Sequence, residues 1–256
     1  MTSTFSLTQT GLAANEPVPV TNQEEQQLRR VFDRLCDYDA RSSTNSEITT
    51  LTASIRMLKT TGRLKDAEEL QAKVTSLQNE LAHLENKKDK KFSCADVFQM
   101  MQTLKYKITK LQVEEYVWEV DEDLDQCVNW NEMKLMYTRN LRDKTGLEPN
   151  RIFNVTQFLI YDRNENNKVS VDETMNMLYA RYGRAKMEMK LKELFGANML
   201  ETGREGGEIG FTAFIGAVDK VQLEMFWKTT KGRIISQTTS GRKSLETLVN
   251  TVTQPL

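Results

Sequence analysis

A short polar stretch, residues 121–132, carries oxygen-bearing side chains at nearly every second position. It reads DEDLDQCVNWNE and ends on a glutamate. A hard cation such as Ca²⁺ binds about six to eight oxygen atoms, and alternating carboxylates and amides closed by a glutamate supply them. The spacing therefore predicts a calcium loop, and the simpler alternative is a solvated acidic turn. The candidate ligands are Asp121, Asp123, Asp125, the carbonyl of Cys127, Asn129 and Glu132.

A second stretch, residues 162–173 (DRNENNKVSVDE), repeats this pattern. Only its first and last ligands are anionic, so we expect weaker binding or a preference for staying empty. At the sixth position a calcium loop turns with positive φ, which favours glycine. Gln126 is unfavourable there, whereas Asn167 tolerates a left-handed backbone better. The candidate ligands are Asp162, Asn164, Asn166, the carbonyl of Lys168, Ser170 and Glu173.

Both stretches lie between apolar segments with helical spacing, which predicts helix-loop-helix units. The eighth residue of each loop is β-branched, Val128 and Val169, where two paired loops exchange a short strand contact. Equivalent apolar anchors occur at Phe92 and Ile209, and the four anchors are spaced by 36, 41 and 40 residues. A repeat of this period predicts four such units between residues 24 and 228.

The repeat resembles the EF-hand superfamily of calmodulin and troponin C. The resemblance implies an all-α fold of two EF-hand pairs, first with second and third with fourth, in lobes at residues 22–140 and 141–228. Calcium is the implied cofactor of the second and third units. The outer units are degenerate, and we expect no metal in them. Ala213 stands where the fourth unit needs a glutamate, and Asp37, Asp39 and Asp96 are interpreted as relics of a ligand set in the first.

An insertion at residues 41–90 interrupts the first unit. The segment TNSE, residues 44–47, is typical of a helix start, and a turn is predicted at Thr61 and Gly62. Apolar residues at helical spacing on both sides predict an antiparallel helical hairpin or coiled coil. Its two stripes satisfy one another or leave surface for a partner helix, and the sequence does not decide between these. The stripes are Ile48, Leu51, Ile55 and Leu58, then Leu70, Val74, Leu77, Leu81 and Leu84.

Composition excludes several functional classes. Lys and Arg total 35 against 36 Asp and Glu, which gives no reason to expect nucleic acid as a partner. There is no apolar run long enough to insert in a membrane. Three cysteines in 256 residues, without a signal-peptide core, favour a reduced, cytoplasmic compartment. Residues 1–21 are expected to form an extended tail, and residues 229–256 a basic one with Lys231, Arg233, Arg242 and Lys243 against Glu246.

The inventory of catalytic groups does not favour an enzyme. His83 is the only histidine, and it falls on the polar side of the predicted hairpin helix. Neither a phosphate-binding loop, a nucleotide fingerprint nor a nucleophile elbow occurs. The cysteines are interpreted as structural thiols, although Cys36 and Cys94 flank the same interrupted unit. We therefore expect a non-enzymatic protein.

Two functional hypotheses remain. One is a structural or assembly protein that holds helical or coiled-coil partners with or without metal. The other is a calmodulin-like sensor that exposes a methionine-rich groove when calcium binds. Degenerate units and a helical insertion favour the first hypothesis, whereas methionines at helical spacing are also ordinary core residues. The methionines concerned are Met100, Met101, Met133, Met136, Met175 and Met177.

The region from residue 141 to 228 is similar to EF-hand proteins of ciliary and flagellar axonemes. That group includes proteins bound to doublet microtubules and the small subunit of the outer dynein arm docking complex. The similarity implies that the protein belongs to the cytoskeleton of a cilium or flagellum. It also implies tubulin and axonemal coiled-coil proteins as partners.

Overall fold

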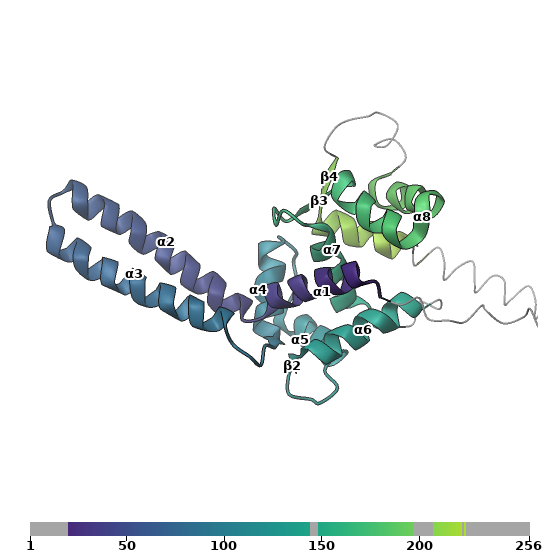
Figure 1. Ribbon diagram of the computed structural model, residues 1–256, viewed down its shortest axis with the longest axis horizontal. Coiled ribbons are helices and arrows are strands. Elements are labelled where there is room, and N and C mark those ends of the chain that lie inside the picture. The colour runs from purple at the N-terminus through teal and green to yellow at the C-terminus, as the bar shows by residue number, and fades with distance from the viewer. Residues whose placement is uncertain (1–19, 144–147, 197–206, 222, 224–256) are drawn as a thin grey trace, which may run out of the picture.

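The computed structural model describes residues 20–143, 148–196, 207–221 and 223. This part of the chain is mostly helical, with strands of only two or three residues, so the predicted all-α class is confirmed. Two long helices project from a body that contains the other elements (Figure 1). Of the predicted tail at residues 1–21, residues 1–19 lie outside the described part of the chain, as does the whole predicted tail at residues 229–256.

The body begins with α1 (Asn22–Leu35), which starts at a capping box between Thr21 and Glu24. In this motif the side chain of each residue accepts a hydrogen bond from the other's backbone N–H, so free donors at the helix start are satisfied. The apolar face of α1 is buried in the core through Leu28, Val31, Phe32 and Leu35.

The projecting arm consists of α2 (Tyr38–Thr60) and α3 (Leu64–Glu85), packed antiparallel. Gly62 takes φ 78° between them, as the predicted turn requires. The arm has a small core of its own, so its two stripes face one another and the predicted hairpin is confirmed. That core consists of Ile55, Ala67 and Val74, with Ile48, Leu51, Leu58 and Leu70 packed around it.

The predicted start of the hairpin at Thr44 is wrong. Helix α2 begins at Tyr38, directly after Asp37, whose φ of 52° is left-handed. The reason is tertiary, because the Asp96 carboxylate accepts a hydrogen bond from the backbone N–H of Asp39 at 2.9 Å. Arg41 Nη2 also donates to the last carbonyls of α1, including that of Cys36 at 2.9 Å. Only Cys36 and Asp37 therefore separate α1 from α2.

The first two units share a short antiparallel strand contact. Strand β1 (Phe92–Ser93) pairs with β2 (Cys127–Val128), and Phe92 lies opposite Val128. Helix α4 (Cys94–Thr103) follows β1, while α5 (Lys110–Trp118) and α6 (Trp130–Arg142) precede and follow β2. The loop at residues 121–132 thus lies mainly between two helices, as its flanking apolar residues predict.

The last two units repeat this arrangement. Helix α7 (Arg151–Tyr161) leads to β3 (Lys168–Ser170) and α8 (Val171–Phe195), and β4 (Glu208–Gly210) leads to helical residues 211–221. Strand β3 pairs with β4, with Val169 opposite Ile209. The four apolar anchors therefore lie in two antiparallel contacts, the first with the second and the third with the fourth.

A single hydrophobic core extends through the body. Its cluster of buried side chains runs from Leu28 in α1 to Ile215, and so includes residues from both predicted lobes. Among the described helices, none is both long and apolar enough to cross a membrane.

Candidate metal-binding loops

The loop between α5 and α6 brings three carboxylates together. Oxygen atoms of Asp121, Asp123 and Glu132 lie within 4.8 Å of one another. Asp121 and Glu132 are buried, whereas Asp123 is exposed. Three negative charges at this separation repel one another, and a bound cation offsets that repulsion. The first, third and twelfth loop positions therefore converge as the sequence predicts.

Backbone amides hold these side chains in place. Glu132 reaches back across the loop, where its Oε1 accepts from the N–H of Glu122 at 3.0 Å and its Oε2 from that of Asn129 at 2.8 Å. Asp121 Oδ2 accepts from the N–H of Gln126 at 2.8 Å. The carboxylates are thus fixed by the chain itself.

The other predicted ligands of this loop have different contacts. Asp125 forms an exposed ion pair with Lys91 Nζ, and that hydrogen bond lowers the pKa of its carboxyl. Asn129 caps α6, since its Oδ1 accepts from the backbone N–H of Asn131 and Glu132. Cys127 lies in β2 opposite Ser93. Each of these three residues therefore has a structural contact of its own, outside the cluster of three carboxylates.

The sixth loop position has the predicted left-handed backbone in both loops. Gln126 takes φ 65° and Asn167 takes φ 63°. A side chain beyond Cβ is strained in this region, less for asparagine than for glutamine. The loop at residues 121–132 therefore has the stronger set of charges and the more strained turn.

The loop between α7 and α8 repeats the same hydrogen bonds. Asp162 Oδ2 accepts from the N–H of Asn167 at 3.2 Å. Glu173 reaches back to the N–H of Asn164 at 3.3 Å and of Ser170 at 3.0 Å. Because the first and twelfth positions make equivalent bonds in both loops, the repeat seen in the sequence is also a repeat of local structure.

The middle of the α7–α8 loop is held by contacts with β4. The amide of Asn166 donates to Glu208 at 3.3 Å, and Lys168 Nζ pairs with the same carboxylate at 2.9 Å. Asn164 Oδ1 accepts from the N–H of Asn166 at 3.0 Å, within the loop itself. Asn166 is therefore engaged by β4, whereas Ser170 Oγ donates to Glu173 Oε2 at 2.9 Å within the loop.

Two arginines of α1, which sequence reasoning missed, contact this loop. Arg34 Nη1 lies 3.4 Å from Asp162 Oδ2, and Arg34 Nη2 donates to Asn167 Oδ1 at 3.4 Å. Arg30 Nη2 donates to the carbonyl of Leu159 at 2.8 Å. The only signal in the sequence is that the two arginines are four residues apart and so share a helix face. Nothing in that spacing identifies their partner.

Burial and Arg34 act in opposite directions on Asp162. Its side chain is fully buried, and burial raises the pKa of the carboxyl, while the Arg34 guanidinium lowers it. Among the described residues, Asp162 Oδ1 has no hydrogen-bond partner. An unpaired buried carboxylate oxygen is costly, so this oxygen is suited to a cation.

The two loops differ in how well their residues suit Ca²⁺. The α5–α6 loop offers three convergent carboxylates, which matches the oxygen preference of Ca²⁺. The α7–α8 loop offers two carboxylates and a buried oxygen without a partner, but an arginine already lies against its first ligand.

The acidic residues of the first unit have structural contacts. Asp96 forms a capping box with Ser93 and holds the start of α2 through Asp39. Asp37 forms an ion pair with Lys87 at 3.3 Å. These contacts give Asp37 and Asp96 partners within the chain. Ala213 lies in helical residues 211–221, and most of the fourth loop, residues 197–206, lies outside the described part of the chain.

Most of the methionines that a sensor would expose are core residues. Met100, Met101 and Met133 are at most 1 % exposed, and Met136 is 6 % exposed. Met175 is partly exposed at 37 %, and the side chain of Met177 is outside the described residues. The four inner methionines therefore fill the interior.

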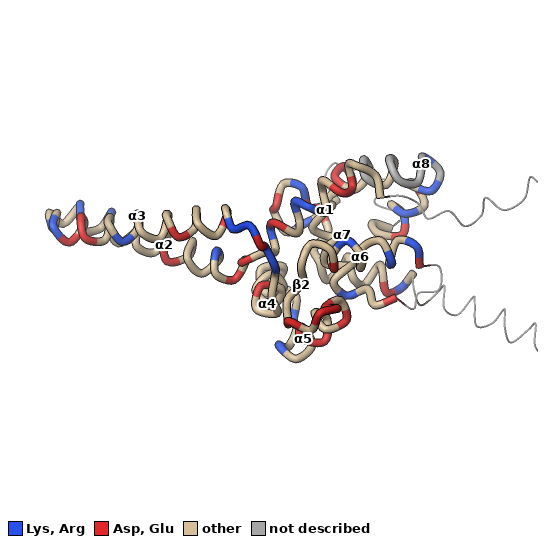
Figure 2. The backbone as a smooth tube through the Cα atoms, turned by 60° about the horizontal axis from the view of Figure 1, so that its bottom comes forward, with Lys and Arg blue, Asp and Glu red and all other residues tan. Residues whose placement is uncertain are grey.

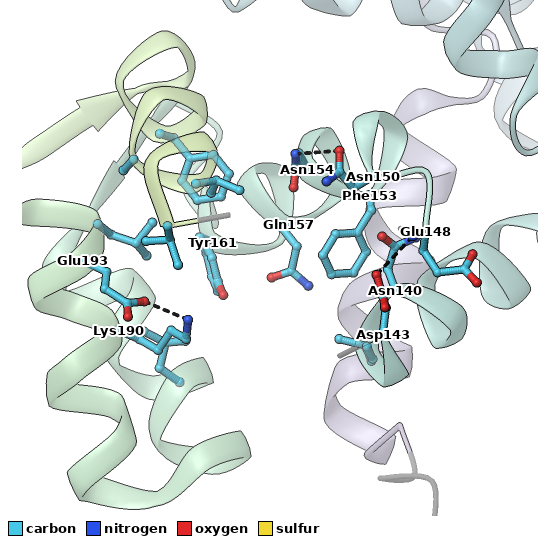
Figure 3. Close-up of a pocket in the computed structure, with 17 residues that line it drawn as sticks. Asn140, Asp143, Glu148, Asn150, Phe153, Asn154, Gln157, Tyr161, Lys190 and Glu193 are labelled. Carbon is cyan, nitrogen blue, oxygen red and sulfur yellow. Dashed lines mark hydrogen bonds and ion pairs between the residues drawn. The ribbon is translucent and has the colours of Figure 1, made fainter. Parts of the chain in front are cut away.

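A groove of about 230 Å³ lies between α6 and α7 on one side and α8 with helical residues 211–221 on the other. Figure 3 shows Phe153 and Tyr161 at its apolar walls, with Lys190 and Glu193 paired at 2.7 Å on the α8 side. No methionine occurs among the described residues that line it. The groove is thus apolar without being methionine-rich.

No protein-family model matches this chain, and no curated protein is significantly similar to it.

Proposed function

We propose that this protein is a non-enzymatic structural or assembly component of the ciliary or flagellar axoneme that holds helical partner proteins with its projecting arm. In this proposal the four helix-loop-helix units are EF-hands, the first two and the last two forming pairs. Calcium binds chiefly in the second unit and stabilises the body. The protein is cytoplasmic, and tubulin and axonemal coiled-coil proteins are the proposed partners.

The observation that carries this proposal is the fixed base of the arm. Beside the bond from Asp39 to Asp96, the hydroxyl of Tyr38 donates to Thr103 Oγ1 at 3.2 Å. One turn further, the amide of Gln99 donates to Ser42 Oγ at 3.2 Å. The first residues of α2 are therefore fastened to α4, and the direction of the arm is set by the body. Such an arm is suited to reaching and holding another protein.

The surface of the arm agrees with a helical partner. Lys, Arg, Asp and Glu are interspersed along α2 and α3 (Figure 2). Mixed charges along helices are typical of surfaces that pair with other helices in register. Near the tip, Met57 is 71 % exposed and Leu64 is 61 % exposed. Apolar side chains at the tip add contact area that the arm itself does not use.

Calcium has a supporting place in this proposal. Asp121, Asp123 and Glu132 would hold it in the second unit, where their oxygen atoms already converge. A cation there offsets the repulsion between the carboxylates and so stabilises the loop. Four of the six methionines are in the core, which does not separate the two hypotheses, because a sensor also buries them until calcium binds. The sensor remains the second candidate, supported by the same convergence of carboxylates.

Co-sedimentation with purified doublet microtubules tests the proposal. The informative variant replaces residues 49–71 with a short Gly-Ser turn. It keeps the ion pair between Glu47 and Lys73, which are 2.7 Å apart, and so shortens the arm at a level where its helices face one another. The matched control is Glu132→Gln, which removes a calcium ligand and keeps the arm.

We expect the full chain to pellet with doublets equally in Ca²⁺ and in chelator, the shortened arm to lose most of this binding, and Glu132→Gln to retain it. Binding that requires Ca²⁺ and disappears in Glu132→Gln would support the sensor instead. If the full chain stays in the supernatant under both conditions, the axonemal assignment is wrong.

A further inference from the structure

The α7–α8 loop already has a cation in contact with its first ligand. Arg34, which precedes Asp162 by 128 residues, places Nη1 3.4 Å from Asp162 Oδ2. Its other terminal nitrogen donates to Asn167 Oδ1 at 3.4 Å, and its Nε lies 3.9 Å from Glu165. One guanidinium thus contacts the first, fourth and sixth positions of a single loop.

This contact is buried. The side chain of Asp162 is fully buried and that of Arg34 is only 11 % exposed. Removing one partner from a buried ion pair leaves the other charge without compensation, which is strongly unfavourable. Separating this pair therefore costs more free energy than separating an exposed surface ion pair.

Arg30 strengthens the same attachment one turn earlier in α1. Its guanidinium donates to the carbonyls of Leu159 at 2.8 Å and Ile160 at 3.3 Å, near the end of α7. The last carbonyls of a helix have no partner within the helix, and a cation there is favourable. Arg30 also lies 3.6 Å from Glu165. Two arginines on one face of α1 thus fasten it to the end of α7 and to the following loop.

We propose that Arg34 is the resident cation of the third loop: its guanidinium takes the place of Ca²⁺ against Asp162, and a divalent cation binds there only when the guanidinium moves away from that carboxylate. This inference rests on the proposal that the third unit is an EF-hand. It adds that a side chain of the protein itself occupies the calcium site of this unit. The same contact fastens α1 to the third unit.

The second loop shows the contrast. Within the described parts of the chain, no lysine or arginine forms an ion pair with Asp121, Asp123 or Glu132. The nearest equivalent is Lys91, which pairs with Asp125 at an exposed position. The two loops share most of their hydrogen bonds and differ in what faces their carboxylates. The clustered carboxylates of the second loop can accept a divalent cation, whereas in the third loop Arg34 already occupies that position.

The third loop nevertheless keeps the means to bind a metal. Asp162 Oδ1 is buried and has no hydrogen-bond partner among the described residues, although its companion oxygen faces Arg34. Glu173 retains the twelfth position, fixed by the N–H groups of Asn164 and Ser170. Removing the guanidinium should therefore leave a loop that can bind a divalent cation.

Calorimetric titration of Ca²⁺ into the full chain tests this occupation of the site with Arg34→Met, alone and combined with Glu173→Gln. In the wild-type chain we expect Glu173→Gln to leave calcium binding unchanged. Arg34→Met should add one binding event, at least tenfold tighter than any third-loop binding in the wild type, and Glu173→Gln should remove it again. Arg34→Met should also lower the melting temperature in chelator, and Ca²⁺ should restore part of the loss.

The matched control is Arg29→Met, which removes an exposed arginine of the same helix that pairs with Asp33. It should add no binding event. If Arg34→Met does not fold, Arg34→Gln removes the positive charge and keeps a hydrogen-bonding side chain, and we expect the same gain. Occupation of the site by Arg34 is refuted if Glu173→Gln removes a calcium ion from the wild-type chain, or if a folded Arg34 variant gains none. A failure of Glu132→Gln to change binding would instead count against the calcium part of the proposed function, whatever Arg34 does.

Discussion

Tyr106 and Phe211 pack edge to face, with their ring centroids 5.2 Å apart, although they come from the two halves that the sequence divides into separate lobes. Phe211 makes a second edge-to-face contact with Phe158 at the same distance. Its side chain is only 2 % exposed. Edge-to-face aromatic pairs are favourable beyond the area they bury. Phe211 therefore links the second unit to the third and fourth within one core.

The first prediction is that Phe211→Ala destabilises the whole body. Truncating a buried phenylalanine costs about 3–5 kcal/mol, from lost burial and the cavity left behind. Because the core is continuous, the variant should still unfold in a single transition, shifted to lower urea. The measurement is urea unfolding followed by tryptophan fluorescence, which reports on the body because α2 and α3 contain no tryptophan. The control is Tyr179→Ala, which removes a side chain that is 59 % exposed and should change stability by less than about 0.5 kcal/mol. Two separate transitions, with only one displaced, would contradict the shared core.

A second prediction concerns the independence of the arm. The arm's core, centred on Ile55, Ala67 and Val74, is distinct from the core of the body. Replacing residues 49–71 with a short turn keeps Ser42 and the other contacts at the base. We expect the melting temperature of the body to stay within a few degrees of the wild type, with a helical signal reduced in proportion to the residues removed. Differential scanning calorimetry and circular dichroism measure both quantities. A large fall in melting temperature would mean that the arm supports the body.

The third prediction is that Gln126→Gly strengthens the second loop. Gln126 holds φ 65°, where a residue with a Cβ is strained by roughly 1–2 kcal/mol, partly offset by the greater chain entropy that glycine loses on folding. The net gain should be about 0.5–1 kcal/mol in the free energy of unfolding, with tighter Ca²⁺ binding. Urea unfolding and calcium titration measure the two effects.

The control for this change is Gln78→Gly. Gln78 is an exposed residue inside α3, where glycine should cost about 1 kcal/mol relative to a good helix former. Opposite signs for the two substitutions would show that the conformation of the backbone decides the outcome. If both substitutions destabilise, the strain attributed to Gln126 is wrong.

Local features of this protein could be predicted from its sequence because they depend on residue type and short spacing. The positive φ at the sixth loop position, the Thr61–Gly62 turn and the strand positions of Val128 and Val169 all follow from such rules. In the second loop, Asp121 and Glu132 converge because the loop folds through its own backbone amides.

The features that could not be predicted depend on contacts between distant residues. Helix α2 starts at Tyr38 because Asp96, which comes after the whole arm, holds its first turn. Arg34 contacts Asp162, which follows it by 128 residues in the sequence. No local pattern distinguishes these partners from other acids, so only the packed structure identifies them.

The fourth prediction is that Cys36 is the least reactive of the three cysteines. Its side chain is 3 % exposed, and burial, together with the nearby acid Asp33, raises the pKa of its thiol to about 12. Since the thiolate is the reactive form, alkylation by iodoacetamide at pH 8 should modify Cys94 and Cys127, which are only half-buried, well before Cys36. Mass spectrometry of the peptides measures the order.

The raised pKa of the Cys36 thiol also determines how the free energy of unfolding changes at alkaline pH. The native thiol keeps its proton between the ordinary pKa of about 9 and its own pKa of about 12, while the unfolded thiol loses it. The native state therefore binds more protons in this window, and the free energy of unfolding falls as pH rises through it. Urea midpoints at pH 8 and pH 10.5 measure this fall in the free energy of unfolding. The fall should be smaller in Cys36→Ala, because the substitution removes the Cys36 thiol and leaves the other groups that titrate at alkaline pH in place. An unchanged pH dependence in Cys36→Ala, or labelling of Cys36 as fast as that of Cys127, would show that the thiol is not protected by the core.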